Sequence, residues 1–347
     1  MPPPSSSGSS LSPGSVVVAP PQHDAHDAHD HHIAAARYHD YRHASNPLSD
    51  GMIGEIPLVE FGADLHQHGG TRIVPLDNAA VLGCSGPATS PGLCANFVRI
   101  RGGEALVTDA NTTSQLLFVM RGTGTSSAVD ADGPPISWKA GDLFTLPARS
   151  RRLHAAHDDA ALYWVHDEPL LRYLGVEATQ RQFTPTLYRR EAILEALEAV
   201  VRDPSSATAN RLSVLLGNRL FPGTKTITHV LWAMFGLLPV GADQAPHRHQ
   251  SVALDLVVDA QPGCYTMVGR TLAADGSIKD ARRIDWQPHA AFVTPPGLWH
   301  SHHNQSGQPA HILPIQDAGL HTFLRTLNIL FSRRRPDGTT EVADQAG

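Results

Sequence analysis

Apolar residues occur along most of the chain in short runs separated by turn-forming residues. Runs of this kind occupy residues 71–76, 93–100, 114–120 and 252–258, and Gly and Pro interrupt the chain between them at short intervals. Short strands with such punctuation are typical of antiparallel barrels. We therefore predict a mainly β protein.

Two segments follow a different period. Residues 188–201 carry Ile193 and Leu197 at helical spacing, with charged residues on the opposite side, and the pattern stops before Pro204. This spacing predicts an amphipathic helix that packs on a barrel. A second amphipathic helix is expected over residues 320–331.

An internal repeat indicates that the chain contains two copies of one barrel-forming unit. Three pairs of segments correspond: 109–120 with 247–258, 138–147 with 286–295, and 167–175 with 317–324. The expected organisation is a disordered, His-rich tail over residues 1–45, a first barrel over 46–185, a helical linker over 186–215, a second barrel over 216–335 and a frayed tail over 336–347.

The second copy carries three histidines with ligand-like spacing. His247 and His249 are two residues apart, so on a strand their imidazoles point to the same face. His300 follows a Pro-x-Gly turn at the start of another predicted strand and can supply a third nitrogen. Three neutral imidazoles suit a first-row divalent metal and leave coordination positions open.

The first copy lacks these ligands. Asp109, Asn111 and Arg152 stand where the three histidines stand in the second copy, and together they make a poor transition-metal site. We interpret the first barrel as a scaffold and dimer surface. His154 and His157 lie near the lost site, and we interpret both as loop residues.

Two motifs in the second copy resemble those of the cupin superfamily. They are Gly-x5-His-x-His over residues 241–249 and Pro-x-Gly-x2-His-x3-Asn over residues 295–304. The acidic ligand common in the first motif is absent, because Leu254 stands there. That absence is typical of the branch that contains the gentisate, salicylate and 1-hydroxy-2-naphthoate dioxygenases, which hold Fe(II) with three histidines.

The resemblance implies an all-β bicupin, with two double-stranded β-helix (jelly-roll) barrels and a few peripheral helices. It also implies an oxidoreductase: an Fe(II)-dependent ring-fission dioxygenase that cleaves a hydroxylated aromatic acid of salicylate or gentisate type with O2 in aromatic catabolism. One iron per chain on His247, His249 and His300, and a homodimer or homotetramer, are expected. The chain departs from that family in one respect, since the family's iron sits in the first barrel.

Two further residues are candidate catalytic groups. His302 shares a strand face with His300 and matches a family residue that faces the bound aromatic acid. Asp255 is predicted to face inward where the family often has an arginine. A buried carboxylate needs a cation or a donor, either an arginine such as Arg270 or Arg283, or a hydroxyl or amine of the substrate.

A different chemistry remains open at the same ligands. With zinc, manganese or nickel, three histidines can support an isomerisation, a hydrolysis or a decarboxylation, and the order of metal affinities does not select iron. The alternative function is therefore a non-redox metal-dependent cupin enzyme or a metal-stabilised binding bicupin.

The amino-acid composition limits the classes of partner that the protein is expected to bind. The net charge of −6 includes no basic surplus, and no long apolar segment stands out, so neither a nucleic acid nor a membrane partner is expected. The three cysteines are interpreted as free thiols in a reducing compartment, and the cytoplasm is the expected location. Residues 23–32 are His-rich and are interpreted as a solvated linker, while His66 and His68 are assigned a structural or surface role.

Overall fold

The computed structural model describes residues 32–130, 133–334 and 340–344. The chain divides into two compact units, residues 1–53 and residues 54–347. In the described part of the first unit, a short helix, α2 (Tyr41–Ala44), begins after Asp40, whose side chain accepts a hydrogen bond from the Arg42 backbone N–H. The His-rich stretch up to residue 31 lies outside the described residues.

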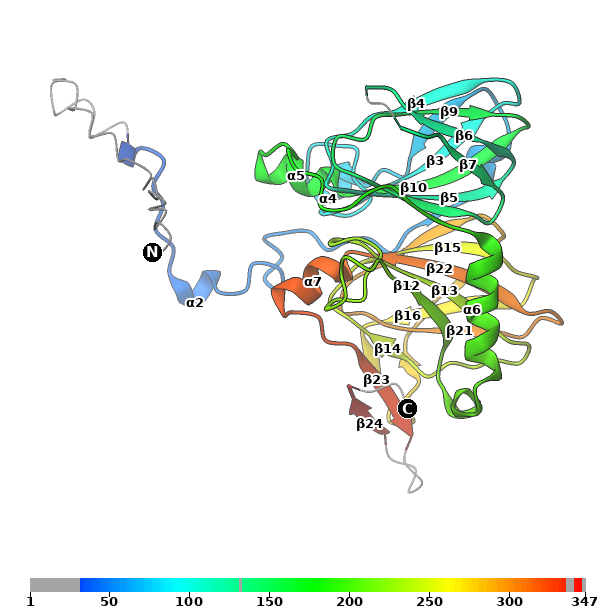
Figure 1. Cartoon of the computed structure of the whole chain (residues 1–347). Coiled ribbons are helices and arrows are strands. Elements are labelled where there is room, and N and C mark those ends of the chain that lie inside the picture. The colour runs from blue at the N-terminus through cyan, green and yellow to red at the C-terminus, as the bar shows by residue number, and fades with distance from the viewer. Residues whose placement is uncertain (1–31, 131–132, 335–339, 345–347) are drawn as a thin grey trace, which may run out of the picture. The chain divides into compact units, whose positions relative to one another are not determined.

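The first barrel is built from two antiparallel sheets (Figure 1). One sheet has the order β11-β8-β5-β10-β3-β2, and the other has the order β4-β9-β6-β7. The strands are β2 (Arg72–Pro75), β3 (Cys94–Ile100), β4 (Ala105–Thr108), β5 (Ser114–Arg121), β6 (Thr123–Ala128), β7 (Ile136–Lys139), β8 (Leu143–Pro147), β9 (Arg152–Ala156), β10 (Ala160–His166) and β11 (Thr186–Tyr188).

The second barrel repeats this arrangement. One sheet has the order β1-β20-β15-β22-β13-β12, the other has the order β19-β16-β21-β14-β23-β24, and β17 pairs with β18 in a separate ribbon. The strands are β1 (Glu60–Phe61), β12 (Leu212–Leu216), β13 (Trp232–Leu238), β14 (His247–Arg248), β15 (Ala253–Asp259), β16 (Cys264–Gly269), β17 (Thr271–Leu272), β18 (Ile278–Lys279), β19 (Arg282–Asp285), β20 (Ala291–Thr294), β21 (Trp299–Asn304), β22 (Ala310–Gln316), β23 (Leu330–Arg334) and β24 (Thr340–Ala343). The expected all-β bicupin is therefore confirmed.

The apolar strands are buried on both faces because the two barrels share a core. On β5, Leu116 and Phe118 pack in a cluster that also contains Leu254 and Leu256 of β15, while Leu117 faces the interior of the first barrel. Figure 1 shows the sheet with β5 and β10 facing the sheet with β15 and β22. Strands covered on both sides carry continuous apolar runs rather than an alternating pattern, which explains the runs in the sequence.

Helices cover the periphery. The helix expected over residues 188–201 is confirmed as α6 (Arg190–Arg202), which buries Ile193 and Leu197. The other described elements are α3 (Asp64–Gln67), α4 (Ala79–Leu82), α5 (Glu168–Leu174), η1 (Pro204–Thr208) and α7 (Ala318–Leu324). Within the described part of the chain, no helix is long and apolar enough to cross a bilayer.

Two predicted segments differ from the structure near the C-terminus. The helix expected over residues 320–331 ends at Leu324, because Arg325 adopts a left-handed conformation with φ 60°. The chain then extends into β23, where Phe331 pairs with His247. The expected frayed tail contains β24, which pairs with β23, and most of β12 lies within the expected linker.

Candidate metal centre

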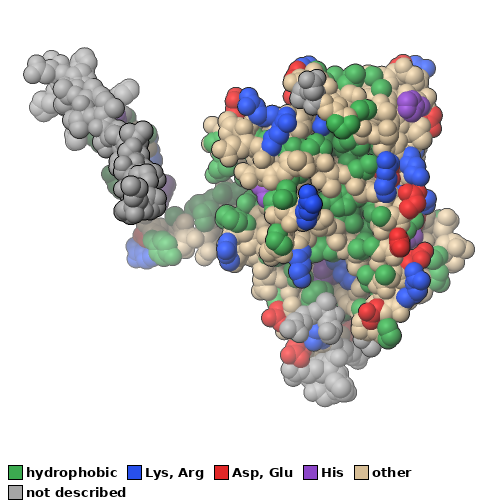
Figure 2. Space-filling view, in the orientation of Figure 1, with side chains coloured by type: hydrophobic (Ala, Val, Ile, Leu, Met, Phe, Trp, Pro, Cys, Tyr) green, Lys and Arg blue, Asp and Glu red, His purple; other side chains and the backbone are tan. Residues whose placement is uncertain are grey.

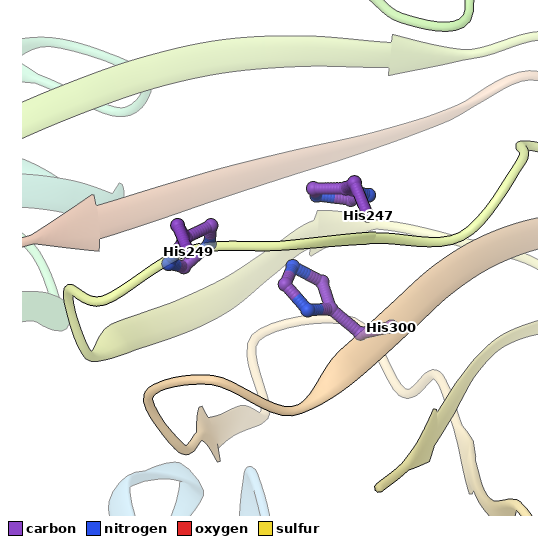
Figure 3. Close-up of side chains that lie close together, drawn as sticks. All are labelled: His247, His249 and His300. Atoms are coloured by element: carbon purple, nitrogen blue, oxygen red, sulfur yellow. The ribbon is translucent and has the colours of Figure 1, made fainter. Parts of the chain in front are cut away.

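Three buried histidines meet inside the second barrel. His247 lies on β14, and His300 is its partner across the strand pair on β21. His249 follows just after β14. One ring nitrogen from each residue lies within 4.8 Å of the others, and the three side chains converge in Figure 3. The sequence prediction that these residues lie together is confirmed.

Backbone carbonyls orient two of the three rings. His249 Nδ1 lies 2.9 Å from the Ser251 carbonyl oxygen, and His300 Nδ1 lies 3.0 Å from the Leu298 carbonyl oxygen. A carbonyl can only accept, so both Nδ1 atoms carry the proton and both Nε2 atoms keep a lone pair. The Nε2 atom of His249 is buried without a hydrogen-bond partner. This arrangement is typical of metal-ligating histidines.

The ring of His247 contacts an arginine that was not predicted from the sequence. Arg211 Nη1 donates to His247 Nε2 at 2.9 Å, so a cationic group already occupies the lone pair that a metal would use. The Arg211 Nε atom is buried without a partner. Arg211 lies in the expected linker, immediately before β12. No motif or spacing in the sequence connects it with the histidines. Its position directly before an apolar strand was the one sign in the sequence that it could be buried.

The electrostatics keep the histidines neutral. Burial lowers the pKa of His249 to about 4. It also lowers the pKa of His247 and His300 well below the usual value, with added repulsion from neighbouring histidines and Arg211. Neutral imidazoles, in a site that contains no carboxylate ligand, fit a divalent transition metal.

His302 faces the same interior. It is buried on β21, and its ring centroid lies 6.0 Å from those of His247 and His300. Its Nδ1 is 2.8 Å from Thr266 Oγ1, which also accepts a hydrogen bond from Trp286 Nε1. Burial lowers the His302 pKa well below the usual value. Among the described residues, Thr266 is the one hydrogen-bond partner of the His302 ring, so Nε2 is free for a ligand.

Asp255 is buried on β15 and 2% exposed. It accepts a hydrogen bond from Thr294 Oγ1 at 2.7 Å. Burial raises its pKa to about 6, although the Thr294 hydrogen bond and the charge of Arg211 act in the opposite direction. The arginine partners named from the sequence were wrong: Arg270 pairs with Glu55, and Arg283 pairs with Asp285. Both are surface pairs, whereas Asp255 is buried on a strand that is covered on both sides.

The first barrel has no equivalent site in its described residues. Asn111 is bonded to the backbone of Val176 and Ala178, and Asp109 pairs with Arg151. Arg152 is buried on β9. No group of three potential ligands other than the histidine cluster of the second barrel occurs in residues 32–130, 133–334 and 340–344.

The interpretation of His154 as a loop residue was wrong. His154 is fully buried on β9, where Nδ1 lies 2.6 Å from Ser126 Oγ and Nε2 lies 2.9 Å from Thr108 Oγ1. Trp138 Nε1 donates to the same Ser126 hydroxyl. This chain of tryptophan, hydroxyl and histidine repeats that of His302 in the second barrel. His157 follows the strand and is exposed, as a loop residue would be.

Two other assignments from the sequence agree with the structure. His66 is buried and its Nε2 lies 3.1 Å from the His289 carbonyl oxygen, which is a structural contact, while His68 is exposed. Cys84, Cys94 and Cys264 are free thiols.

No family model matches the chain, but individual proteins do. It is 26% identical over 205 residues to a 1-hydroxy-2-naphthoate 1,2-dioxygenase of Nocardioides sp. (strain KP7), over 59% of this chain and 48% of that protein. It is 34% identical over 102 residues to a 5-aminosalicylate 1,2-dioxygenase of Comamonas sp., over 29% and 26% of the two chains. It is 28% identical over 154 residues to gentisate 1,2-dioxygenase 1 of Aquipseudomonas alcaligenes, over 44% and 40%.

This chain resembles the bicupin ring-cleaving dioxygenases. A solved salicylate 1,2-dioxygenase variant of Pseudoaminobacter salicylatoxidans, in complex with gentisate, superposes with a TM-score of 0.64 at 14% identity, covering 91% of this chain and 97% of that one. The unmodified enzyme with gentisate gives the same TM-score at 15% identity, covering 90% and 95%. These likenesses show the fold. The sequence alignments span about half or less of the length of the curated relatives.

Proposed function

We propose that the protein is an Fe(II)-dependent ring-fission dioxygenase that cleaves a hydroxylated aromatic acid with O2. The observation that carries this proposal is the cluster of three neutral, buried histidines with a buried cation, Arg211, directly beside it. The relatives named above are, by their names, dioxygenases of aromatic acids, and they support the same class of reaction here.

His247, His249 and His300 would hold the iron through imidazole nitrogens. Bound iron supplies the one-electron chemistry that allows dioxygen to react with an aromatic ring. Because the ligands are neutral, the centre keeps its full positive charge and favours an anionic ligand with two donor oxygens, such as a phenolate with an adjacent carboxylate.

Arg211 would bind the carboxylate of the substrate. Arg211 Nη1 now donates to His247 Nε2, and it would become available to another acceptor if that nitrogen held the metal. The Arg211 Nε atom is already without a partner. A guanidinium pairs well with a carboxylate through two parallel hydrogen bonds, and Asp255 supports its positive charge from within the same barrel.

His302 and Asp255 would act on the bound ring. The free Nε2 of His302 can donate to or accept from an oxygen of the substrate, since the other nitrogen is engaged by Thr266. Asp255 offers a second oxygen beside the one bonded to Thr294, and it suits a hydroxyl or amine substituent. These positions limit which rings fit.

The test is anaerobic reconstitution with Fe(II), followed by measurement of oxygen uptake over salicylates, gentisate and hydroxynaphthoates. We expect uptake that depends on one of these acids. His300→Ala should lose the metal and the activity, whereas Arg211→Gln should retain the metal and raise KM by about ten-fold or more, the effect of losing a charge-assisted hydrogen bond. The zinc-loaded protein is the control for redox chemistry.

Absence of uptake across the panel by the iron-loaded protein would contradict the proposal. Turnover by the zinc-loaded protein without oxygen would instead favour the non-redox enzyme, since three histidines also suit zinc, manganese and nickel.

A further inference from the structure

The first barrel contains a cavity of about 480 Å³ that is lined by several arginines. Five arginine side chains contribute to its wall, together with apolar residues of β7 and β11. The arginines are Arg149, Arg151, Arg152, Arg181 and Arg189. None of these residues belongs to the candidate metal centre, and nothing in the proposed function uses them.

Arg152 occupies the position that His300 holds in the second barrel. Ser126 pairs with His154 across β6 and β9, just as Thr266 pairs with His302 across β16 and β21. Arg152 precedes its histidine by two residues, as His300 does. Arg152 therefore takes the position of the third imidazole of the repeated unit, and it lines the arginine-rich cavity.

The Arg152 side chain is buried without a partner. The residue is 8% exposed, its Nε has no hydrogen-bond partner, and it takes part in none of the ion pairs of the described residues. A buried charge is destabilising without a counter-charge, so a protein normally supplies one. In the described part of the chain no acidic side chain pairs with Arg152, so its guanidinium is available to an anionic ligand in the cavity that it lines.

The neighbouring arginines add to the positive charge. Arg181 donates from Nε and Nη2 to the carbonyl oxygens of Ala148 and Arg149, and these bonds fix the guanidinium without neutralising it. Arg149 also has no acidic partner among the described residues. Within the described residues, Arg151 pairs with Asp109 and Asp130, and Arg189 pairs with Asp142; the other three arginines have no carboxylate partner there.

The remaining wall combines apolar side chains with Ser137, Ser150 and Asp130, whose carboxylate pairs with Arg151. Pro135, Ile136 and Leu187 line the same cavity. A bare inorganic anion gains nothing from such a surface, whereas a molecule with an apolar body buries area against it. A cavity lined by both guanidinium and aliphatic groups fits a molecule that carries a carboxylate on an apolar body.

We propose that this cavity binds a small organic carboxylate with an apolar body, with Arg152 and Arg181 as the groups that hold the carboxylate. The site is separate from the metal centre, and the proposal does not depend on the proposed reaction. It gives the first barrel a binding role at the position where the repeated unit has lost its metal ligands.

Binding is tested by calorimetry on the full, metal-free chain with benzoate, inorganic phosphate and benzyl alcohol. The Arg211→Gln variant serves as the background, because Arg211 in the second barrel is also expected to attract carboxylates. We expect benzoate to bind at one site per chain, and phosphate and benzyl alcohol to bind at least about ten-fold more weakly. Phosphate binding as tight as benzoate, or benzyl alcohol binding equally well, would overturn the assignment of the ligand class.

Variants in the same background locate the site. Arg152→Gln and Arg181→Gln should each weaken benzoate binding by about ten-fold or more, while Arg101→Gln, an exposed arginine of the same barrel paired with Glu104, should leave it unchanged. Unchanged binding in both the Arg152 and the Arg181 variant would refute the proposal.

Thermal unfolding provides a readout that does not depend on calorimetry. Removing an unpaired buried charge should raise the Tm of the ligand-free protein in Arg152→Gln, and benzoate should then raise Tm in the parent but not in the variant. A rise of the same size in both proteins would contradict the site. If Arg152→Gln does not fold, the same comparison is made with Arg181→Gln, whose exposed side chain is held only by carbonyl groups.

Discussion

His302 and His154 occupy the same position in the two barrels but differ in their hydrogen bonds. Both contact a hydroxyl that accepts from a tryptophan N–H. In the first barrel, Thr108 also engages the second ring nitrogen of His154. The second nitrogen of His302 has no such partner among the described residues. The contacts of tryptophan, hydroxyl and histidine that both barrels share are structural. The second barrel, which contains the histidine cluster, differs in that Nε2 of His302 is free.

His302→Ala should therefore reduce turnover without removing the metal. We expect a loss of about 10²–10⁴-fold, the usual contribution of a positioned acid–base group, measured as oxygen uptake per bound metal with the substrate found in the reconstitution panel. His154→Ala is the matched control, and it should lower stability but leave turnover per metal within about two-fold. Equal turnover in His302→Ala and wild type would remove His302 from the chemistry.

Asp255 should make the stability of the metal-free protein depend on pH. Burial raises its folded-state pKa to about 6 from 3.8, so the folded chain binds the proton more tightly than the unfolded chain. Stability from this group is thus greatest below about pH 4 and is lost as the pH rises to about 6, with a maximum effect of about 1.4 kcal/mol for each unit by which the two pKa values differ.

The Asp255→Asn variant has no carboxyl group at this position, so its side chain does not titrate. Its free energy of unfolding, measured with urea, should increase relative to wild type between about pH 4 and pH 6 and differ by a constant amount above that range. Asp285→Asn, an exposed aspartate at the end of β19, serves as the control. A difference between Asp255→Asn and wild type that stays constant through this range would show that the carboxyl does not titrate there.

At the scale of elements, the two barrels end with matching helices that are capped by different residues. Both α5 and α7 end at a residue in the left-handed conformation: Gly175 with φ 66° and Arg325 with φ 60°. Gly adopts this conformation without the steric cost that a Cβ atom imposes. The second copy therefore carries a strained C-cap that the first copy avoids.

Exchanging the cap residues should change stability in opposite directions. Arg325→Gly is expected to stabilise the protein by about 0.5–1 kcal/mol, although it loses the contact of the guanidinium with Phe323. Gly175→Ala is expected to destabilise it by about 1 kcal/mol. A Cβ at Gly175 meets no atom within 4 Å, so the effect comes from the backbone alone. Shifts of the same sign in the two variants, measured by urea unfolding, would contradict this account.

At the scale of the whole molecule, residues 54–347 form one compact unit because the barrels share an apolar core. The chain crosses between the barrels as well: β1 precedes the first barrel in sequence but pairs with β20 in the second. On the face shown in Figure 2, basic and acidic side chains are scattered over both barrels rather than gathered in one patch. A homodimer or homotetramer remains a prediction, which sedimentation at micromolar concentration would test.

The shared core predicts that both barrels unfold together. Near-UV circular dichroism should show a single thermal transition, and zinc should raise the Tm of the whole transition. The free energy of unfolding should increase by about 2.7 kcal/mol when the free metal is 100 times its Kd. His300→Ala should show no such shift. Two transitions, of which only one responds to zinc, would show that the barrels are energetically independent.

Much of the architecture was predictable because it is encoded locally. The apolar runs and their turns indicated the strands, the matching segments indicated two copies, and the helix over residues 188–201 followed from its period. The helix predicted over residues 320–331 was wrong in its C-terminal half, because the apolar spacing continues past Arg325 although the helix ends there. The chain beyond Arg325 forms a strand instead, in which Phe331 pairs with His247. Residue type alone does not distinguish a helical face from a buried strand in such a short segment.

Some features of the candidate site could likewise be predicted from the sequence, and others could not. The sequence by itself determined that His247, His249 and His300 lie together, because strand parity and a turn motif place their side chains on converging faces. Only the tertiary structure decided that Arg211 contacts His247, that Thr294 rather than a surface arginine bonds Asp255, and that Arg152 is buried without a partner. Periodicity reports which face a side chain takes, whereas its partners depend on which distant strands lie beside it in the folded barrel.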